Sequence, residues 1–326
     1  MQLFIEHDNK LYFPSVLDEI KWTTERKGSP GILNFTVVKD EKLSFEEGDH
    51  VAFQYDGDNV FYGFIFTKKR TKEDIIEVTA YDQLRYLKNK DTYTYENKKA
   101  SEVIKILADD FKLRAGTIED TGYVIPSRDE DNQTLFDIIN MALSLTNAAK
   151  GNLFTLYDDY GKLTLKSRES MTLDLMICDE SGEDFNYVSS IDTNTYNKIK
   201  LTYDNKKSGK REVFIAQSSE SINKWGLLQY CETISADSKS NIDEIRAKAK
   251  MMASVMLESY NHVTRSLSFK NLFGDTRARA GASVYVHMNL GDILLKNYML
   301  INKATHIYSK DTHFMDFELI GDNIYG

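Results

Sequence analysis

Short runs in which apolar and polar residues alternate dominate the first part of the chain. In one of them Ile20 and Trp22 are separated by a single polar residue, as on a strand with one buried face. The five runs lie at 18–24, 33–38, 50–55, 60–67 and 73–81. The Asp-Gly turn at 56–59 between two of these runs is a strong hairpin signal. Strands this closely spaced are typical of a barrel or sandwich, so we predict an N-terminal β-barrel domain over residues 1–95.

The apolar period changes from two to about 3.6 after Tyr81, which predicts helices. Helices are expected at 81–87, 100–111 and 134–146, a strand at 123–126, and a hairpin at 153–166. Asp131 or Asn132 is available to cap the last of these helices. Residues 96–170 are therefore predicted to form helix-bearing middle modules.

Strand-like patterns return after Met171. Strands are expected at 197–203, 212–216 and 227–233, and again from 265 to 326. Residues 240–258 carry apolar side chains at the 3–4 spacing of a long amphipathic helix. We predict a second β-barrel domain over 171–326, with the long helix 240–258 inserted in it. The pattern leaves open whether strands within 185–235 belong to this barrel.

Two parts of the chain share a degenerate pattern. Each has a Gly-Asp turn, then an aliphatic strand, then an alternating strand that ends near an aspartate. The three pieces are Gly48-Asp49, 62–67 and 74–82 in the first part, and Gly291-Asp292, 299–304 and 313–322 in the second. A duplicated barrel and a chance likeness between two strand meanders both explain the pattern. Duplication predicts that 73–81 and 313–319 occupy equivalent places in two superposable barrels.

Composition narrows the class of protein. The 326 residues are 41% hydrophobic and 28% charged, as in a globular protein, and an aromatic content of 12% favours strands. With 41 basic against 50 acidic residues the net charge is −9, whereas a free-standing nucleic-acid binder carries a basic surplus. The N-terminus lacks the pattern of a signal peptide, so we expect synthesis in a cytoplasm. Cys178 and Cys231 could pair there, but two free buried thiols are favoured.

Candidate chemistry is sparse. His306 and His313 lie on neighbouring predicted strands, where a metal would need a third ligand such as Asp311 or Asp316. Histidines on a strand surface explain the same pair and are the favoured interpretation. The chain has no cysteines with zinc spacing, no phosphate loop and no nucleophile elbow. We therefore predict no catalytic residue, no cofactor-binding residue and no metal ligand.

Acidic and basic clusters have structural interpretations. A glycosidase needs two carboxylates at a fixed separation, so those at 129–131 and 158–159 are assigned to a loop with a helix cap and to a hairpin turn. The calcium-like turn at 56–59 lacks the final glutamate of a calcium loop. Basic runs at 68–72 and 206–211 fall at predicted turns and are expected to be solvated.

The segment 79–91, TAYDQLRYLKNKD, followed by 99–104, KASEVI, resembles the XkdQ/YqbQ family. The members of this family are baseplate hub proteins of PBSX-like prophages and contractile phage tails, and R-type bacteriocins such as the diffocins carry similar hubs. The resemblance extends over nearly the whole chain, including the strand at 313–319. It implies an α+β, strand-rich fold with two similar β-barrel domains and small helix-bearing modules between them.

The resemblance also implies a function. Such hubs are homotrimeric rings that adapt a six-fold tail tube to a three-fold central spike, within a phage tail or bacteriocin particle. The implied partners are further copies of the chain, tail tube protein, central spike protein and baseplate wedge proteins, with no membrane and no sequence-specific nucleic acid. Two barrels in each of three chains give six positions, which favours the duplication.

Two further expectations concern assembly and activity. Exposed strand edges invite pairing between chains, and the aromatic strand at 60–66 is expected at such a contact. The helix-bearing modules are expected at the periphery or at the spike-facing side of the ring. The alternative to a structural hub is a tail-associated hydrolase that acts on a glycan such as peptidoglycan through an unrecognised carboxylate pair.

Overall fold

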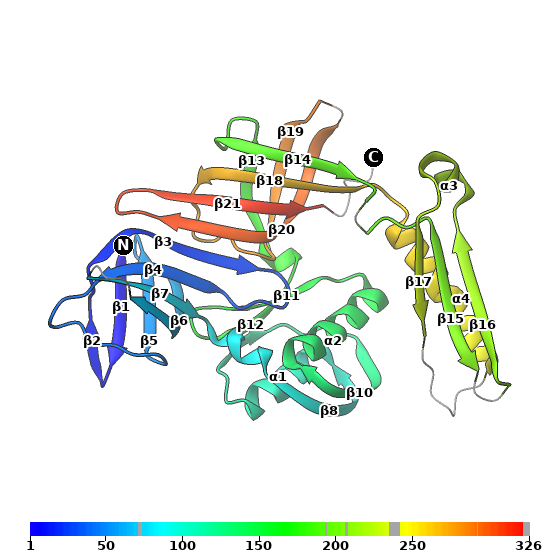
Figure 1. Ribbon diagram of the computed structural model, residues 1–326, viewed down its shortest axis with the longest axis horizontal. Helices are drawn as coiled ribbons and strands as arrows, with labels where there is room; N and C mark the ends of the chain where they lie inside the picture. The colour runs from blue at the N-terminus through cyan, green and yellow to red at the C-terminus, as the bar shows by residue number, and fades with distance from the viewer. Residues whose placement is uncertain (71–73, 193, 206–207, 235–241, 292, 322–326) are drawn as a thin grey trace. The chain divides into compact units, whose positions relative to one another are not determined.

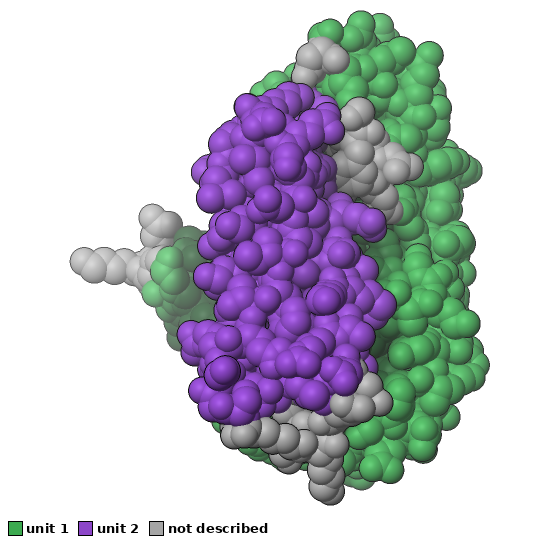
Figure 2. Space-filling view, turned by 90° about the vertical axis from the view of Figure 1, so that its right-hand side faces the viewer, with its two compact units in different colours: residues 1–186, 267–321 green, residues 187–266, 322–326 purple. Residues whose placement is uncertain are grey.

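The computed structural model describes residues 1–70, 74–192, 194–205, 208–234, 242–291 and 293–321. They form two compact units, coloured separately in Figure 2. Unit 1 combines Met1–Asn186 with Leu267–Gly321, and unit 2 contains Tyr187–Ser266. Strands dominate unit 1, whereas unit 2 combines a small sheet with helices (Figure 1), so the predicted α+β, strand-rich class is confirmed for the described residues taken together.

The N-terminal strands include the five predicted runs, which alternate more and less buried side chains, and two strands before them that were not predicted. They are β1 (Gln2–His7), β2 (Lys10–Tyr12), β3 (Val16–Glu25), β4 (Ile32–Val38), β5 (His50–Tyr55), β6 (Asp58–Arg70) and β7 (Ile75–Tyr81). On β7, for example, Ile76, Val78 and Ala80 are buried. These inward residues join those of the neighbouring strands in one apolar core. The predicted hairpin at 56–59 connects β5 to β6.

The C-terminal strands continue the same sheet. They are β13 (Thr172–Cys178), β14 (Asp184–Ser190), β18 (Thr264–Phe273), β19 (Ser283–Asn289), β20 (Leu294–Tyr308) and β21 (His313–Ile320). Together with β1 to β7 they make a 13-stranded sheet, in which β20 pairs with β3. In the described part of the chain, no strand pairing closes either group of strands into a separate barrel, so the prediction of two barrels is wrong at this point. The two groups are instead joined edge to edge in one sheet.

The two groups of strands have the same topology. The N-terminal order is β3-β4-β7-β6-β5-β1, and the C-terminal order is β14-β18-β21-β20-β19-β13. If the strands of each group are numbered in chain order and β2 is left out, both groups have the spatial order second, third, sixth, fifth, fourth, first. β2 has no counterpart in the C-terminal group. One difference is that β1 runs antiparallel to β5, whereas β13 runs parallel to β19. We call the two groups repeat 1 and repeat 2.

Matching hydrogen bonds show which residues of the two repeats correspond to each other. The Gly48 N–H donates to the Ile65 carbonyl, and the Gly281 N–H donates to the Ile301 carbonyl, both at 2.8 Å. Directly after each isoleucine the strand carries an irregularity against its neighbour, β7 or β21. Ile65 and Ile301 are therefore equivalent, and β7 and β21 occupy equivalent places, as duplication predicts.

One piece of the predicted duplication is wrong. The structural equivalent of Gly48 is Gly281, whereas Gly291 follows β19 in the position that the β5–β6 turn holds in repeat 1. Gly48 and Gly281 both have positive φ, of 97° and 93°. The sequence likeness around Gly291 does not identify the equivalent residue, because glycine is common in turns of many kinds. Asp292, the other residue of that turn, lies outside the described residues.

A middle module lies between the repeats, with the predicted helices and hairpin. Its elements are η1 (Gln83–Lys88), β8 (Lys90–Lys99), α1 (Ala100–Asp110), β9 (Ala115–Ile118), β10 (Val124–Thr134), α2 (Leu135–Lys150), β11 (Phe154–Asp158), β12 (Leu163–Ser167) and η2 (Glu169–Met171). The apolar faces of α1 and α2 share one core. The predicted cap of α2 is wrong: Thr134 caps it, accepting from the Asp137 N–H at 3.1 Å, because β10 runs through Asp131 and Asn132.

Unit 2 is a three-stranded sheet with a long helix on it. Its elements are β15 (Lys198–Asn205), β16 (Lys210–Gln217), α3 (Ser219–Trp225), β17 (Gln229–Thr233) and α4 (Ile242–Tyr260). Ala249 and Ala253 on α4 pack with Ile199, Leu201 and Phe214 of the sheet. The predicted start of this helix at residue 240 lies outside the described residues. None of the helices that the structure describes is long and apolar enough to cross a membrane.

The cysteines are both free, and they differ in exposure. Cys178 at the end of β13 is half-buried, whereas Cys231 on β17 is exposed. The expectation of two buried thiols is therefore wrong for Cys231. β17 pairs with β15 along one side only in the described structure, which leaves its side chains more open than an interior strand would.

Candidate functional site

The strand pairing between β20 and β3 joins the two repeats. β20 is long, and its first part pairs with β19. Its second part, residues 303–308, lies between β21 on one side and residues 20–25 of β3 on the other. Figure 1 shows β20 beside β3 at the centre of the sheet. We call the antiparallel pairing of 303–308 with 20–25 the repeat junction.

Buried and partly buried side chains make contacts across the repeat junction. The Thr23 and Thr305 hydroxyl oxygens lie 3.2 Å apart across the two strands. The buried Thr24 hydroxyl accepts from the Ala280 N–H at 3.0 Å. Tyr308 from β20 is fully buried in the core of repeat 1, with its ring centroid 5.0 Å from that of Phe53. Repeat 2 therefore completes the core of repeat 1.

The predicted histidine pair lies at this junction. His306 Nδ1 is 2.8 Å from His313 Nε2, and His306 Nε2 is 2.5 Å from the Ala278 carbonyl oxygen. Because a carbonyl only accepts, His306 Nε2 donates to it, and His306 Nδ1 then accepts from His313. Burial, aided by the neighbouring His313, lowers the pKa of His306 to about 3. Burial also lowers the pKa of His313 to about 4.

Asp311 and Asp316, considered as third metal ligands beside the two histidines, have other surroundings in the structure. Asp316 Oδ2 is 2.6 Å from the Lys270 ammonium, and Asp311 is exposed in the β20–β21 turn. Within the described ranges, no group of three or more histidine, cysteine or acidic side chains is arranged to hold a metal ion. The two histidines instead bond to each other, and His306 also donates to the Ala278 carbonyl. The expected position on the strand surface is wrong for His306, which is fully buried and therefore needs both partners.

We expect the histidine pair to make the stability of the protein depend on pH. In the unfolded chain both histidines titrate near pH 6.5, so between that value and their lowered folded pKa values the unfolded state binds more protons. The free energy of unfolding should have its full value above pH 6.5 and should decrease as the pH drops towards 4. Each histidine contributes up to about 1.4 kcal/mol per pH unit. Urea denaturation at pH 7 and pH 5 measures the slope.

A matched pair of variants isolates the cause. His313→Gln keeps a donor for His306 but removes one titrating ring, so the slope between pH 7 and pH 5 should become shallower. His287→Gln changes an exposed histidine on β19 and should leave the slope unchanged. An unchanged slope in His313→Gln would show that the pair does not carry the pH dependence.

A buried cluster of charged side chains lies next to the junction. The half-buried Arg279 side chain places its guanidinium between the rings of Trp22 and Tyr157, 5.3 Å and 4.1 Å from their centroids. Its Nη2 donates to the Asp158 carbonyl at 2.9 Å. Burial lowers the pKa of Arg279, while Tyr157 and the carboxylates of Asp158 and Asp82 act in the opposite direction. The cation is held here by aromatic faces and nearby negative charge.

Asp82 and Gln83, in the middle of the family-like segment 79–91, tie this cluster together. The Asp82 carboxylate accepts from the Gly31 N–H at 2.8 Å and from the Leu84 N–H at 3.0 Å, so it caps η1. Gln83 donates to the Asp158 carboxylate at 2.8 Å. Burial, followed by the charge of Asp158, raises the pKa of Asp82. The segment thus attaches the middle module to repeat 1.

The carboxylates considered for a hydrolase are engaged within the chain. Asp129 accepts from the Thr94 hydroxyl and Asp131 from the Thr92 hydroxyl, while Glu130 pairs with Arg128 at 2.8 Å. All of 129–131 belongs to β10, which pairs with β8, so the predicted loop is wrong at this point. Asp158 is buried at the cluster described above, and its partner Asp159 is exposed.

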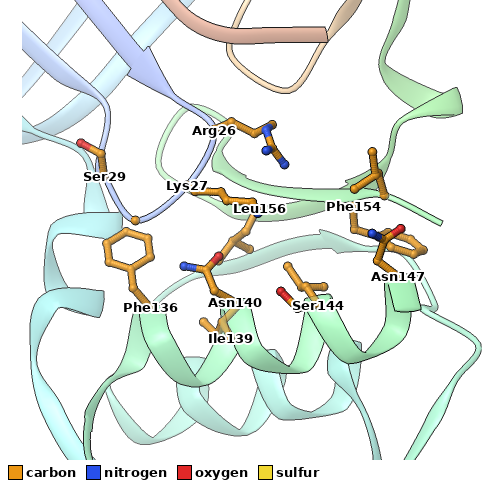
Figure 3. Close-up of a pocket in the computed structure, with 13 residues that line it drawn as sticks. Arg26, Lys27, Ser29, Phe136, Ile139, Asn140, Ser144, Asn147, Phe154 and Leu156 are labelled. Atoms are coloured by element: carbon orange, nitrogen blue, oxygen red, sulfur yellow. The ribbon is translucent and has the colours of Figure 1, made fainter. Parts of the chain in front are cut away.

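Two hollows of unit 1 lie against the middle module. The first is enclosed by the β3–β4 turn, α2 and β11, and its volume of about 50 Å³ holds a few water molecules (Figure 3). Burial lowers the pKa of Arg26, which borders it. The second hollow, of about 320 Å³, is lined by His50, Tyr62, Phe64, Gln83, Tyr86, Phe111, Lys112, Leu113, Arg114 and Gly161. Neither of these two linings includes an acidic side chain, and a glycosidase site requires two. A third hollow, of about 310 Å³ over β3, β4 and β7, is lined by Asp18, Glu19 and Glu77, of which Glu19 pairs with Lys21 and Glu77 with Lys69.

The strand at 60–66, expected at a contact with another chain, lies inside the chain's own fold. β5 pairs with β6 up to Phe64, and β7 pairs with β6 from Phe64 onward. Its outward rings also have partners, since Tyr62 lies 5.7 Å from Tyr160 and Phe64 lies 5.6 Å from Tyr86. A charge placed there would disturb the packing of the middle module against repeat 1.

Comparison with known proteins identifies the family. The family model described as YQBQ-like matches residues 20–320. The chain belongs to the YQBQ-like family. The chain is 32% identical over 285 residues to the uncharacterized protein YqbQ of Bacillus subtilis strain 168, covering 86% of this chain and 83% of that protein. It is 28% identical over 333 residues to XkdQ, a phage-like element PBSX protein of the same organism, covering 99% and 98%.

Solved structures share the fold of this YQBQ-like chain. The 43 kDa tail protein of prophage MuSo2 from Shewanella oneidensis matches with a TM-score of 0.67 and 12% identity, over 98% of each chain. An Escherichia coli type VI secretion component, itself similar to the T4 tail proteins gp27 and gp5, matches with a TM-score of 0.55 and 12% identity, over 100% of this chain and 78% of that one. The predicted family is confirmed, and the distant structures support the fold.

Proposed function

We propose that this protein is the structural hub of a contractile tail baseplate, in a phage tail or an R-type bacteriocin. Three copies form a ring that adapts the six-fold tail tube to a three-fold central spike. The observation that carries this proposal is the duplication: two repeats of identical strand order within one chain, joined by strand pairing. The relative in the PBSX phage-like element and the fold shared with the MuSo2 tail protein support it.

The duplication has a reason in symmetry. A six-fold tube ends on six equivalent surfaces, and a three-fold spike offers three. Three chains with two equivalent repeats each present six similar surfaces to the tube while keeping only three-fold symmetry. A single repeat per chain would need six copies, and the spike would then face twice as many chains as it has subunits.

The remaining parts of the chain follow from this arrangement. We propose that repeats 1 and 2, which lie within the divisions 1–95 and 171–326, are the two ring-forming domains, with the helix-bearing modules 96–170 between these divisions. The modules lie at the periphery or on the spike-facing side. The proposed partners are other copies of the chain, the tail tube, the spike and the baseplate wedge proteins. The proposed role involves no binding to a membrane or to a specific nucleic-acid sequence.

Copy number in the intact particle tests the ring. We expect three copies per baseplate by mass measurement of purified particles, and particle imaging without imposed symmetry should show a ring with three-fold symmetry at this chain. Six copies, or a ring with true six-fold symmetry, would contradict the proposal.

The proposed role requires no catalysis, cofactor or metal from this chain. Purified protein incubated with bacterial cell walls should therefore release no soluble glycan or peptide fragments, as measured by chromatography against a lysozyme control. Release of fragments would favour the alternative, a glycan-directed tail hydrolase. Variants of Asp129 and Glu130 that abolished the release would then locate its carboxylates.

A further inference from the structure

The correspondence between the two repeats draws attention to one edge of β6. In repeat 2 the corresponding edge of β20 is the one that pairs with β3. Ile65 and Ile301 are equivalent, so residues 67–70 of β6 correspond to residues 303–306 of β20. Residues 303–306 have β21 on one side and β3 on the other. Residues 67–70 have β7 on one side, and in the described part of the chain no strand pairs with their other side. Repeat 1 therefore repeats the geometry of repeat 2 without its partner.

β14 is the matching edge strand of repeat 2, since in the described part of the chain it pairs with β18 on one side only. It holds the place in repeat 2 that β3 holds in repeat 1, and it is the end strand of the 13-stranded sheet. At the repeat junction β3 has its Ile20 and Trp22 side chains buried, 0% and 3% exposed. In β14, Phe185 and Val188 are 43% and 44% exposed. An open apolar edge strand of this kind is a site for strand addition.

We propose that the β6 edge at 67–70 of one copy pairs with β14 of the next copy, so that the repeat junction recurs between chains. This inference rests on the proposed ring and names the surfaces that close it. Each copy then offers one donor edge and one acceptor strand, which is a head-to-tail contact that closes when the rotation closes. Three junctions within chains and three between chains give one continuous ring of six repeats.

Charge complementarity selects the same pairing. The β6 edge carries the basic run that begins with Lys68, and Lys69 and Arg70 are exposed there. β14 begins at Asp184 and follows three more exposed acidic residues, Asp179, Glu180 and Glu183. Opposite charges on two edges raise the rate of encounter and fix the register of docking.

The direction of pairing brings these charges together. At the repeat junction β20 and β3 are antiparallel, so the later residues of β20 meet the earlier residues of β3. Applied to β6 and β14, this rule places Arg70, at the end of β6, near Asp184, at the start of β14. The described part of the basic run, residues 68–70, becomes part of the contact. It was expected as a solvated turn but belongs to β6, where Lys68 is half-buried against Phe45 and Lys69 pairs with Glu77.

Disulfide trapping in assembled particles tests the pairing. In a background with Cys178→Ser and Cys231→Ser, Arg70→Cys is combined in turn with Phe185→Cys, Asn186→Cys or Tyr187→Cys. Mild oxidation of purified particles should produce covalent dimers and trimers, and no larger species, for at least one combination. The control combines Lys210→Cys with Phe185→Cys, because Lys210 belongs to the other basic run, and it should stay monomeric on a denaturing gel.

The possible outcomes separate this inference from the proposed function. Particles that contain three copies but yield no cross-link from any of the three combinations would overturn the inference and leave the hub standing. Particles without a three-copy ring would overturn both. A ladder that continues beyond trimers would show an open contact and would also overturn the proposed ring.

Charge reversal gives an independent test by particle titre. Arg70→Glu and Asp184→Lys each place like charges at the proposed contact, and each should lower the titre of assembled particles about ten-fold or more. The double variant restores opposite charges and should recover most of the titre. Lys210→Glu, with the same change of charge on the other basic run, should leave it unchanged. Failure of the double variant to recover, with each single variant normally folded, would contradict the pairing.

Discussion

Replacing Arg279 with methionine is expected to lower the free energy of unfolding by about 3–5 kcal/mol. The methionine fills much of the same space between Trp22 and Tyr157 but removes the buried positive charge. Asp82 and Asp158 then remain buried with no cation near them. Chemical denaturation at pH 7, followed by tryptophan fluorescence, measures the change.

The matched control is Arg277→Met, two residues away. Arg277 has more ion pairs than Arg279, with Asp275 at 2.7 Å and Asp174 at 2.8 Å, but its side chain is 56% exposed. Exposed pairs are screened by water, so this variant should cost less than about 1 kcal/mol. Equal losses in the two variants would show that the Arg279 cluster is no more important than a surface ion pair.

The Arg279 effect should also depend on pH in a defined direction. Without the cation, the pKa values of Asp82 and Asp158 rise further above those of the unfolded chain, because only their hydrogen bonds then oppose burial and mutual repulsion. An acid whose folded pKa is raised destabilises the fold above that pKa. The difference between Arg279→Met and the unchanged protein should therefore be largest near pH 7 and shrink as the pH falls towards 4.

Local periodicity was sufficient to predict most of repeat 1. Alternation at 73–81 gave β7, and the Asp-Gly pair at 56–59 gave the β5–β6 hairpin, because both signals depend on residues close in sequence. The same reasoning could not give the β8–β10 ribbon. Its strand β8 reads KDTYTYENKK, with Tyr95 buried among exposed polar residues, so little apolar alternation marks it. Such strands are specified by their partner rather than by their own pattern.

The duplication could be predicted only in part. The likeness of 74–81 to 313–320 was real, because both strands bury the same alternate positions in one sheet. The Gly48 match failed because the functional equivalent, Gly281, precedes an alanine in place of an aspartate. What is shared at these two glycines is a positive φ and a backbone hydrogen bond, and neither leaves a side-chain signature.

The buried cluster was also hidden from the sequence. Asp82, Asp158 and Arg279 come from three different parts of the chain, and each looks like an ordinary surface residue in its local context. The resemblance pointed to segment 79–91 without giving a reason for it. The structure supplies one, since Asp82 and Gln83 bind Gly31 and Asp158 and thereby join repeat 1 to the middle module.

Replacing Gly63 with alanine is expected to cost about 2–3 kcal/mol. Gly63 lies on β6 beside Val51 of β5, at the point where β6 changes partner from β5 to β7. A Cβ atom there would overlap the Tyr81 carbonyl group, which is backbone and cannot turn away as a side chain could. Either β7 moves outward or β6 bends, and each loses packing in the core. Thermal and urea denaturation report the loss.

Gly57→Ala is the control for removing a glycine. Gly57 has φ of 87° in the β5–β6 turn, and a Cβ atom there meets nothing within 4 Å. The cost is then only that of the left-handed backbone, about 1 kcal/mol. A loss for Gly63→Ala no greater than that for Gly57→Ala would show that β7 is free to move away from β6.

Comparison of the repeats explains why β6 needs this glycine. The position equivalent to Gly63 in β20 is Met299, whose side chain is fully buried, so the topology itself accepts a large residue. The difference lies at the end of the neighbouring strand. In repeat 1, Tyr81 leads directly into Asp82, which is bound to the Gly31 N–H and holds the end of β7 in place. Gly63→Ala should therefore become less costly when Asp82→Ala is present, and a double-mutant cycle measures this coupling.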